Sequence, residues 1–258
     1  MSAPKSRPHR GIYFLPSLLT VANIFCGFYS IVSSMKGDLE LAAILIGWAI
    51  VLDALDGRVA RLANATSEFG REFDSLADVV SFGVAPGVLA YVWALRLWPR
   101  VGWLACFLFL ICGAMRLARF NIQKQADDRR FFVGMPIPGA ASVLASIVFM
   151  FPKPLETLGQ AIPITALVAA LGLLMVSTLR YYSFKDIDLK GRHPYLVILL
   201  LALLFVAIGT HPQVMLLSMS VTYLVSGMAL KSYSLIRRSN LAPAREEALP
   251  SGPKDADA

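Results

Sequence analysis

Apolar residues in this chain are gathered into long blocks, most of them about 17 to 23 residues, the length that a helix needs to cross a hydrocarbon core of about 30 Å. A lone strand cannot satisfy its backbone in lipid, so the blocks are expected to be helices. Because 57% of the 258 residues are hydrophobic and only 16% are charged, lipid must solvate part of the surface. The sequence therefore predicts an all-α fold, a polytopic membrane helix bundle with about eight transmembrane helices, over residues 12–34, 39–63, 75–95, 101–120, 137–151, 162–179, 194–209 and 213–233.

The block at 137–151 is the shortest, and prolines stand at both of its ends. It could be tilted or partly re-entrant. We expect residues 1–238 to form one membrane domain. The tail at 239–258 carries mixed charges and several prolines and has almost nothing to bury, so we predict a disordered cytoplasmic segment.

Lysine and arginine are distributed unequally between the two sides of the predicted helices. Of the 24 Lys and Arg residues, all except Lys36, Arg96, Arg100 and Lys153 fall on one side. Cytoplasmic loops of membrane proteins carry the excess of these residues. We therefore predict a protein of the cell (inner) membrane whose termini and polar segments lie on the cytoplasmic side, which requires an even number of helices.

The remaining composition excludes several function classes. The formal charge of +7 does not indicate nucleic-acid binding, because the basic residues stand at block edges and not on one surface interleaved with aromatic residues. The three cysteines lie inside apolar blocks without metal-type spacing, and the three histidines are scattered. The sequence thus indicates no nucleic-acid partner, no disulfide framework and no histidine-based metal site or triad.

Four aspartates stand at the polar ends of two neighbouring blocks. Asp53 and Asp56 are spaced i, i+3 in the second predicted helix, and Asp74 and Asp78 are spaced i, i+4 at the start of the third, so each pair shares one helical face. The connection between the blocks is short, which makes the helices antiparallel neighbours. We expect the two pairs of carboxylates to meet.

Four carboxylates at the edge of a membrane cannot all stay ionised without a counter-charge, because burial and mutual repulsion disfavour the charged form. A hard divalent cation supplies that charge, and oxygen-only ligation suits Mg²⁺, Mn²⁺ or Ca²⁺ and not a thiolate-type zinc site. Asp53 lies roughly 15 Å from the end of its helix at about 1.5 Å per residue. The site is therefore expected to be a polar cavity that faces the cytoplasm, with Gly57 and Gly70 allowing a ligand to approach the backbone closely.

A plainer alternative is that the aspartates are neutralised by neighbouring arginines or face water at helix ends. The arginines concerned are Arg58, Arg61 and Arg71. Asp74, near the predicted helix start, could act as a cap or interact with the helix dipole. Asp53, two turns or more inside an apolar block, is the hardest to explain in this way.

Eight residues reproduce the pattern D-x2-D-G-x2-A-R-x8-G-x3-D-x3-D, which resembles the motif of the CDP-alcohol phosphotransferases. They are Asp53, Asp56, Gly57, Ala60, Arg61, Gly70, Asp74 and Asp78. The resemblance implies that the four aspartates bind one or two Mg²⁺ or Mn²⁺ ions across the pyrophosphate of a CDP-linked lipid, and that Asp78 is the general base. It also implies that Gly57 and Arg61 help to hold the CDP moiety and that the protein is a homodimer.

Longer segments are similar to the phosphatidylserine synthase branch of this family, over roughly residues 16–185. The segments are TVANIFCGF from Thr20, DSLADVVSFGVAP from Asp74, ICGAMRLARFN from Ile111 and FVGMPIP from Phe132. Met115 and Met135 stand where leucine would be expected, and both changes are conservative. The similarity implies metal-dependent transfer of a phosphatidyl group from CDP-diacylglycerol to L-serine, giving phosphatidylserine and CMP.

Several polar residues near the predicted site are candidates for substrate contacts. Serine offers a carboxylate besides its hydroxyl, so its pocket needs a fixed cation. The candidates for the acceptor pocket are Arg116, Arg119, Asn121 and Lys185. The basic ones could instead extend to lipid phosphate. Asn23 and Ser81 could line the pocket of the CDP-lipid, although Asn23 could equally form a hydrogen bond between helices.

Other acceptors stay open, namely choline, inositol phosphate and glycerol phosphate. Choline would require an aromatic cage, and a phosphorylated acceptor would require several clustered cations. From a different class, a cation transporter could also place carboxylates in a membrane. It would be expected to show polar groups near the bilayer midplane and inverted repeats, and neither is evident in this sequence.

Overall fold

The structure is a computed structural model that describes residues 14–62, 67–123, 131–177, 180–182 and 194–227. Its elements in chain order are α1 (Phe14–Lys36), α2 (Leu39–Leu62), α3 (Glu68–Asp78), the π-helical turn η2 (Val79–Val84), α4 (Ala85–Trp93), the 3-10 turn η3 (Leu95–Leu97), α5 (Pro99–Gln123), β1 (Phe131–Val133), α6 (Ile137–Met150), α7 (Leu158–Val176), β2 (Arg180–Tyr182) and α8 (Pro194–Thr210). A further helix covers residues 212–227. The predicted all-α fold is confirmed, apart from two short strands.

Each predicted block is helical where the structure describes it, including the short block at 137–151, which is α6. The main difference is in the third block, which was expected to begin near residue 75 and begins at Glu68. The predicted tail at 239–258, the basic segment at 1–13 and the end of the last predicted helix lie outside the described residues.

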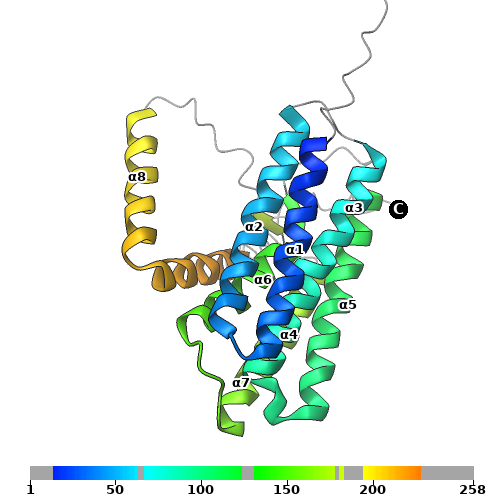
Figure 1. Cartoon of the computed structure of the whole chain (residues 1–258), viewed down its shortest axis with the longest axis vertical. Coiled ribbons are helices and arrows are strands. Elements are labelled where there is room, and N and C mark those ends of the chain that lie inside the picture. Colours follow the sequence, from blue (N-terminus) through cyan, green and yellow to red (C-terminus); the bar gives the residue numbers. More distant parts are fainter. Residues whose placement is uncertain (1–13, 63–66, 124–130, 178–179, 183–193, 228–258) are drawn as a thin grey trace, which may run out of the picture.

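Helices α1 and α2 form an antiparallel pair joined by a tight turn (Figure 1). Gly37 in this turn has a φ of 85°, which glycine adopts without steric cost. The side chain of Asp38 accepts the Leu41 N–H at 3.2 Å at the start of α2. Across the pair, the Ser30 hydroxyl donates to the Ala42 carbonyl at 2.8 Å. The end of α2 that carries the aspartates therefore returns to the level where α1 begins.

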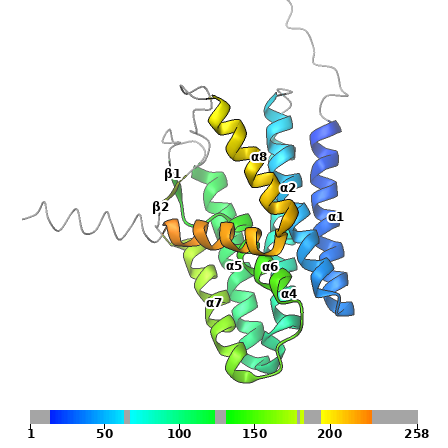
Figure 2. The same cartoon turned by 90° about the vertical axis from the view of Figure 1, so that its left-hand side faces the viewer.

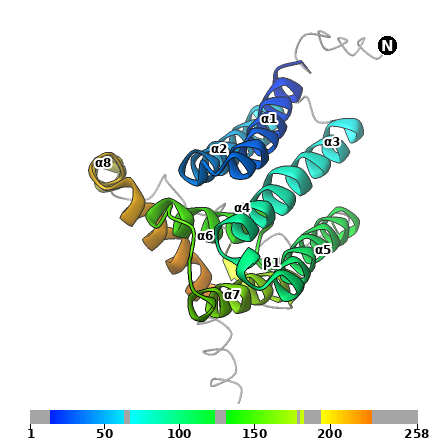
Figure 3. The same cartoon turned by 60° about the horizontal axis from the view of Figure 1, so that its bottom comes forward.

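Elements α3, η2 and α4 form one continuous helix, which lies between the α1–α2 pair and α5 (Figure 3). Ser67 caps its start by accepting the Gly70 N–H at 2.9 Å. The suggestion that Asp74 caps this helix is therefore wrong. Pro86 lacks an N–H and its ring would crowd the preceding turn, and the helix widens there into a π turn in which the Ala85 N–H donates to the Val80 carbonyl.

The core lies where α2, α4, α5 and α6 meet, and small residues make up much of it. Its buried members include Ala42, Ile46, Ala49, Ala85, Leu89, Phe109, Ala140, Ala141 and Leu144. Small residues allow helix backbones to approach closely, which is how helices associate in lipid. Trp93 donates from its indole N–H to the carbonyls of Phe151 and Lys153 at 2.8 and 2.9 Å, so the end of α4 is tied to the segment after α6.

A short antiparallel ladder that the sequence did not predict pairs β1 with β2, Phe131 lying opposite Tyr182. Gly134 follows β1 with a φ of 84°, and a Cβ at this position would collide with the Met175 carbonyl oxygen. The N–H of Met135 donates to the Leu174 carbonyl at 3.1 Å. The segment FVGMPIP therefore docks against the end of α7 and requires glycine at position 134.

Helix α8 stands apart from α1–α7 in Figure 1, and helix 212–227 runs across the bundle in Figure 2. Helix 212–227 contacts α6 through a hydrogen bond of 2.7 Å between the Ser220 and Ser146 hydroxyls. On α8, Leu203 and Phe205 are 64% and 74% exposed. Apolar exposure of this kind is expected for a helix that lipid solvates.

Four segments among the described residues are long and apolar enough to cross a membrane. They are Ser17–Lys36, Glu68–Trp93, Pro99–Ile122 and Leu158–Val176. Helix α2 is 24 residues long but carries two aspartates and two arginines near its end, and α6 has only 14 residues. These segments indicate a membrane protein, and the number of eight transmembrane helices stays a prediction.

Candidate active site

The four predicted aspartates come together where α1, α2 and α3 meet. Ligand oxygens of Asp53, Asp56 and Asp74 all lie within 4.8 Å of one another. Asp78, one turn after Asp74, has its carboxyl group within hydrogen-bonding reach of Asp53. Two helices that are separate in sequence thus contribute to a single acidic cluster, defined as these four residues.

The acidic cluster points into the bundle because of the register of its helices. On α2, Asp53 and Asp56 continue the face that buries Ile46 and Ala49, since residues three, four and seven apart share one side of a helix. Asp56 and Asp78 are buried, being 4% and 9% exposed, and the other two are half-buried. Acidic side chains therefore occupy the end of a stripe that is otherwise apolar.

Thr20 on α1 contributes a contact that sequence reasoning missed. Its hydroxyl donates to Oδ2 of Asp56 at 3.2 Å, and both side chains are buried. One signal in the sequence could have found it. Thr20 stands three residues before Asn23, so these two polar residues share one face of the helix.

Asn23 is fully buried, and within the described part of the chain neither atom of its amide group has a hydrogen-bond partner. The expected bond between helices is made by its backbone instead, because the Ser81 hydroxyl donates to the Asn23 carbonyl at 3.0 Å. Glycine at position 27 allows this approach, since a Cβ there would collide with Ser81. A buried amide with unused donors and acceptors, one turn from Thr20, is suited to receive a polar ligand.

The oxygens of the acidic cluster fit a hard divalent cation. Oxygens bound to one such ion lie within about 4 to 5 Å of each other, because metal–oxygen distances are about 2.0 to 2.6 Å. Asp53, Asp56 and Asp74 meet this spacing. Oδ1 of Asp78 is buried and has no hydrogen-bond partner among the described residues, a costly state that a cation would relieve. The cluster can therefore hold a metal ion, and its all-carboxylate donors favour Mg²⁺, Mn²⁺ or Ca²⁺.

The neighbouring arginines lie away from this cluster's buried centre. Arg58 and Arg61 are exposed on α2, and Arg71, also exposed, lies 3.8 Å from Glu68. An exposed ion pair of this kind contributes little to stability. These side chains do not supply the buried counter-charge that Asp56 and Asp78 require.

Gly57, Arg61 and Gly70 of the motif have different surroundings. A Cβ on Gly57 would meet nothing within 4 Å, so space is open beside it, and Arg61 is exposed one turn further along α2. Gly70 donates its N–H to Ser67, and a Cβ there would lie 3.0 Å from the Ser67 hydroxyl oxygen. Gly57 and Arg61 therefore border open space next to Asp56, whereas Gly70 shapes the start of α3.

Of the candidates for the acceptor pocket, the structure brings Arg116 to the acidic cluster. Arg116 on α5 is 8% exposed, its charge interacts first with the Tyr223 side chain and then with that of Asp78, and its Nε has no hydrogen-bond partner among the described residues. Its guanidinium carbon lies 5.9 Å from the centre of the Phe120 ring. Arg116 is therefore a buried cation whose charge interacts with a carboxylate of the acidic cluster.

The other three candidates are placed differently. Arg119 is exposed on α5. Asn121 donates from Nδ2 to the Ser75 hydroxyl at 2.9 Å, so it joins α5 to α3 beside Asp74. Lys185 lies outside the described residues.

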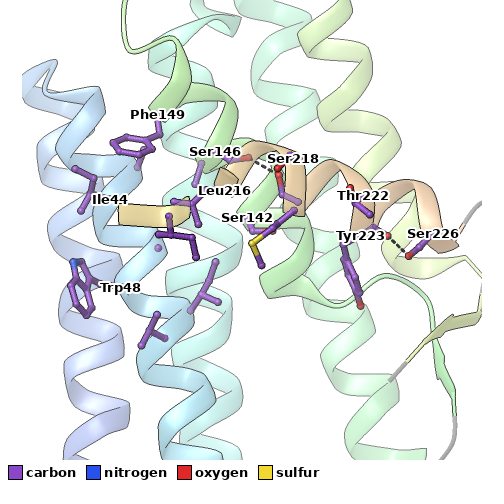
Figure 4. A pocket seen from close by; sticks show the side chains of 18 residues that line it. Ile44, Trp48, Ser142, Ser146, Phe149, Leu216, Ser218, Thr222, Tyr223 and Ser226 are labelled. Atoms are coloured by element: carbon purple, nitrogen blue, oxygen red, sulfur yellow. Dashed lines mark hydrogen bonds between the residues drawn. The ribbon is translucent and has the colours of Figure 1, made fainter. Parts of the chain in front are cut away.

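A hollow of about 850 Å³ lies away from the acidic cluster, between α2, α6 and helix 212–227 (Figure 4). Apolar side chains such as Ile44, Trp48 and Phe149 line it together with several hydroxyls, and none of its lining residues is charged. Its Ser146 hydroxyl is already engaged with Ser220. This hollow has no carboxylate to hold a metal ion and no cation to pair with a pyrophosphate, so the chemistry is assigned to the acidic cluster.

Comparison with known proteins gives a match over most of the chain. A family model described as CDP-alcohol phosphatidyltransferase matches residues 13–178, which include the acidic cluster, Thr20 and Arg116. A CDP-diacylglycerol–serine O-phosphatidyltransferase of Helicobacter pylori is 42% identical, over 77% of this chain and 84% of the relative. One of Bacillus subtilis is 38% identical, over 67% and 92%. An archaetidylserine synthase of Methanothermobacter thermautotrophicus is 37% identical, over 65% and 69%.

Proposed function

Since this chain belongs to the CDP-alcohol phosphatidyltransferase family, we propose that it transfers a phosphatidyl group from CDP-diacylglycerol to L-serine, giving phosphatidylserine and CMP. The observation that carries the proposal is the convergence of Asp53, Asp56 and Asp74 within 4.8 Å, with Asp78 beside them. Serine is favoured as the acceptor because all three relatives described above are named for it.

The acidic cluster is proposed to bind one or two Mg²⁺ or Mn²⁺ ions through its four carboxylates. A bound divalent cation would neutralise negative charge on the pyrophosphate and on the departing CMP. The spacing of the oxygens and the unpartnered Oδ1 of Asp78 support this assignment. The chain itself supplies the fixed positions of these carboxylates, on two helices that pack against α1.

The CDP-lipid is proposed to bind across the junction of α1, α2 and α3. The residues assigned to it are Asn23, Asp53, Gly57, Arg61, Gly70, Asp74 and Ser81. The unused amide of Asn23 and the open space beside Gly57 support direct contact. Ser81 acts through the backbone of Asn23, and Gly70 acts by forming the start of α3.

Asp78 is proposed to be the general base. In its ionised form, a carboxylate within hydrogen-bonding reach of the serine hydroxyl takes the proton as the serine oxygen attacks phosphorus. The burial of Asp78 supports this role, because a carboxylate has about four lone-pair sites and a bound cation leaves others to a substrate hydroxyl. The serine oxygen displaces CMP directly, so no covalent bond between protein and lipid is required.

Arg116 is proposed to bind the serine carboxylate, since it is a buried cation whose charge interacts with Asp78, and a guanidinium forms charge-assisted hydrogen bonds with a carboxylate. Arg119, Asn121 and Lys185 remain candidates for the same pocket. The excess of Lys and Arg on one side supports an inner-membrane protein whose active site faces the cytoplasm, where serine is dissolved. A homodimer stays a prediction from the family resemblance.

The acceptor can be tested with membranes that contain the protein, CDP-diacylglycerol and Mn²⁺ or Mg²⁺. Labelled serine, choline, inositol phosphate and glycerol phosphate are supplied in separate reactions, and labelled lipid and CMP are measured. We expect labelled lipid and CMP to form with serine and with none of the other three alcohols. Product with another alcohol and none with serine would overturn the assignment of the acceptor.

The metal requirement is tested in the same membranes. We expect EDTA to abolish transfer, and an excess of Mn²⁺ or Mg²⁺ to restore it, because the four carboxylates lose their counter-charge when the ion is removed. Full activity after exhaustive chelation would contradict the proposal that the acidic cluster binds a catalytic metal ion.

A further inference from the structure

We infer that Thr20 is a positioning residue for Asp56, whose hydroxyl holds this carboxylate in the orientation that the metal site requires. The inference rests on the proposed function, because it takes Asp56 as a metal ligand. Thr20 lies on α1, outside the stretch of eight motif residues, which runs from Asp53 to Asp78. It would make α1 a part of the metal site, although this helix contributes no carboxylate to it.

The hydrogen bond joins two helices in a place that both side chains keep buried. The Thr20 hydroxyl donates to Oδ2 of Asp56 at 3.2 Å, and the residues are 5% and 4% exposed. If the donor is removed, the buried carboxylate oxygen is left without a hydrogen bond, and the protein is destabilised by the full desolvation penalty of that oxygen. An ionised carboxylate has about four lone-pair sites, so accepting this bond leaves others for a cation.

The donor itself is held rigidly. Threonine is branched at Cβ and has few χ1 rotamers in a helix, so its hydroxyl points in a restricted set of directions. The turn of α1 that follows is fixed by the bond from Ser81 to the Asn23 carbonyl at 3.0 Å. Further along, Ser30 bonds to Ala42 of α2 at 2.8 Å. The position of α1 thus determines where the Asp56 oxygens lie relative to Asp53 and Asp74.

Two substitutions distinguish the effect of the Thr20 hydroxyl from the effect of the side-chain shape. Thr20→Val keeps the branched shape and removes the donor, whereas Thr20→Ser keeps the donor. Binding of Mn²⁺ alone is measured on the full-length, detergent-solubilised protein by the electron paramagnetic resonance signal of free Mn²⁺. We expect Thr20→Val to weaken Mn²⁺ binding by about 10-fold, as for loss of a hydrogen bond behind a metal ligand, and Thr20→Ser to restore most of the affinity.

Ser30→Ala is the matched control, because it removes another buried hydrogen bond between α1 and α2 at a distance from the acidic cluster. We expect it to lower the midpoint of thermal unfolding and to leave Mn²⁺ affinity unchanged. A Thr20→Val protein that is less stable but binds Mn²⁺ like the wild type would overturn the inference and leave the proposed function standing. A wild-type protein that binds neither Mn²⁺ nor Mg²⁺ would overturn both.

Discussion

Asp78 lies beside Asp53 and is 9% exposed, so its carboxylate is shielded from water and close to a second acidic group. Asp78→Asn keeps the size of the side chain, and it removes the proposed base together with one of the four proposed metal-binding carboxylates. We expect transfer to fall by about 100-fold or more, the range of a general base, while binding of CDP-diacylglycerol stays measurable. Turnover and lipid binding are measured on the same preparation.

The control for this substitution is Glu72→Gln on the same helix, where the side chain is exposed. It should leave turnover unchanged. Normal turnover by Asp78→Asn would show that another group accepts the proton.

Arg116 and Arg119 stand one turn apart on α5, and they offer a second test at the scale of single residues. Both arginines belong to the segment ICGAMRLARFN, but Arg116 is buried and its charge interacts with Asp78, whereas Arg119 is exposed. We expect Arg116→Ala to raise the KM for serine by about 10-fold or more, the effect of losing a charged hydrogen bond, with a smaller change in the KM for CDP-diacylglycerol. Because Arg119 is exposed, Arg119→Ala should raise the KM for serine by less than Arg116→Ala does.

Equal effects of Arg116→Ala on both substrates would point to a structural or lipid contact instead.

Residue spacing was sufficient to predict that four carboxylates would meet, because helical periodicity and a short connection leave few other arrangements. Thr20 was not predictable in the same way. Hydroxyls inside helices commonly bond to their own backbone, as Ser34 does to Ser30 and Thr165 does to Ala161. A bond across 36 residues of sequence depends on how α1 and α2 pack, which periodicity does not encode.

At the scale of elements, apolar blocks predicted the helices well because membrane helices are defined by their length and composition. The start of α3 was missed because Glu68, Arg71 and Glu72 are exposed and polar, so the cap at Ser67 marks the boundary and hydropathy does not. The β1–β2 ladder was missed because its two strands have three residues each and pair over a long range. Three residues are too few for a recognisable alternation.

The contact between α1 and η2 predicts that alanine substitutions at two glycines will have very different effects on stability. A Cβ on Gly27 would collide with Ser81, whereas a Cβ on Gly47 would meet nothing within 4 Å. We expect Gly27→Ala to destabilise the protein by about 1–3 kcal/mol, the usual cost of overpacking, and to lower activity. Gly47→Ala should leave stability equal or slightly higher, since alanine is the better helix former.

Thermal unfolding of the purified variants in detergent checks this difference. If Gly27→Ala were as stable as Gly47→Ala, the α1–η2 contact would be looser than the structure shows.

At the scale of the whole molecule, the turn at Gly37 lies at one end of the α1–α2 pair and the start of α3 lies at the other (Figure 1). The proposed orientation places the active site on the cytoplasmic side, so Lys36→Cys should react with a membrane-impermeant thiol reagent in intact cells. Glu68→Cys should react only after the cells are permeabilised. Labelling of the two variants before and after permeabilisation measures this directly.

The unmodified chain provides the background for this labelling, since Cys26 and Cys106 are half-buried and Cys112 is buried. The reverse pattern would place the acidic cluster outside the cell and contradict the proposed orientation.

The π turn before Pro86 changes which side of the helix the residues after it face. One additional residue in a turn rotates everything after it by about 100°, since an α-helix advances 3.6 residues per turn. The half that carries Asp74 and Asp78 and the half that packs Leu89 into the core are therefore out of phase with each other. Deleting a single residue between Val79 and Val84 would restore a regular helix, and would turn either the carboxylates or the core residues to the wrong side.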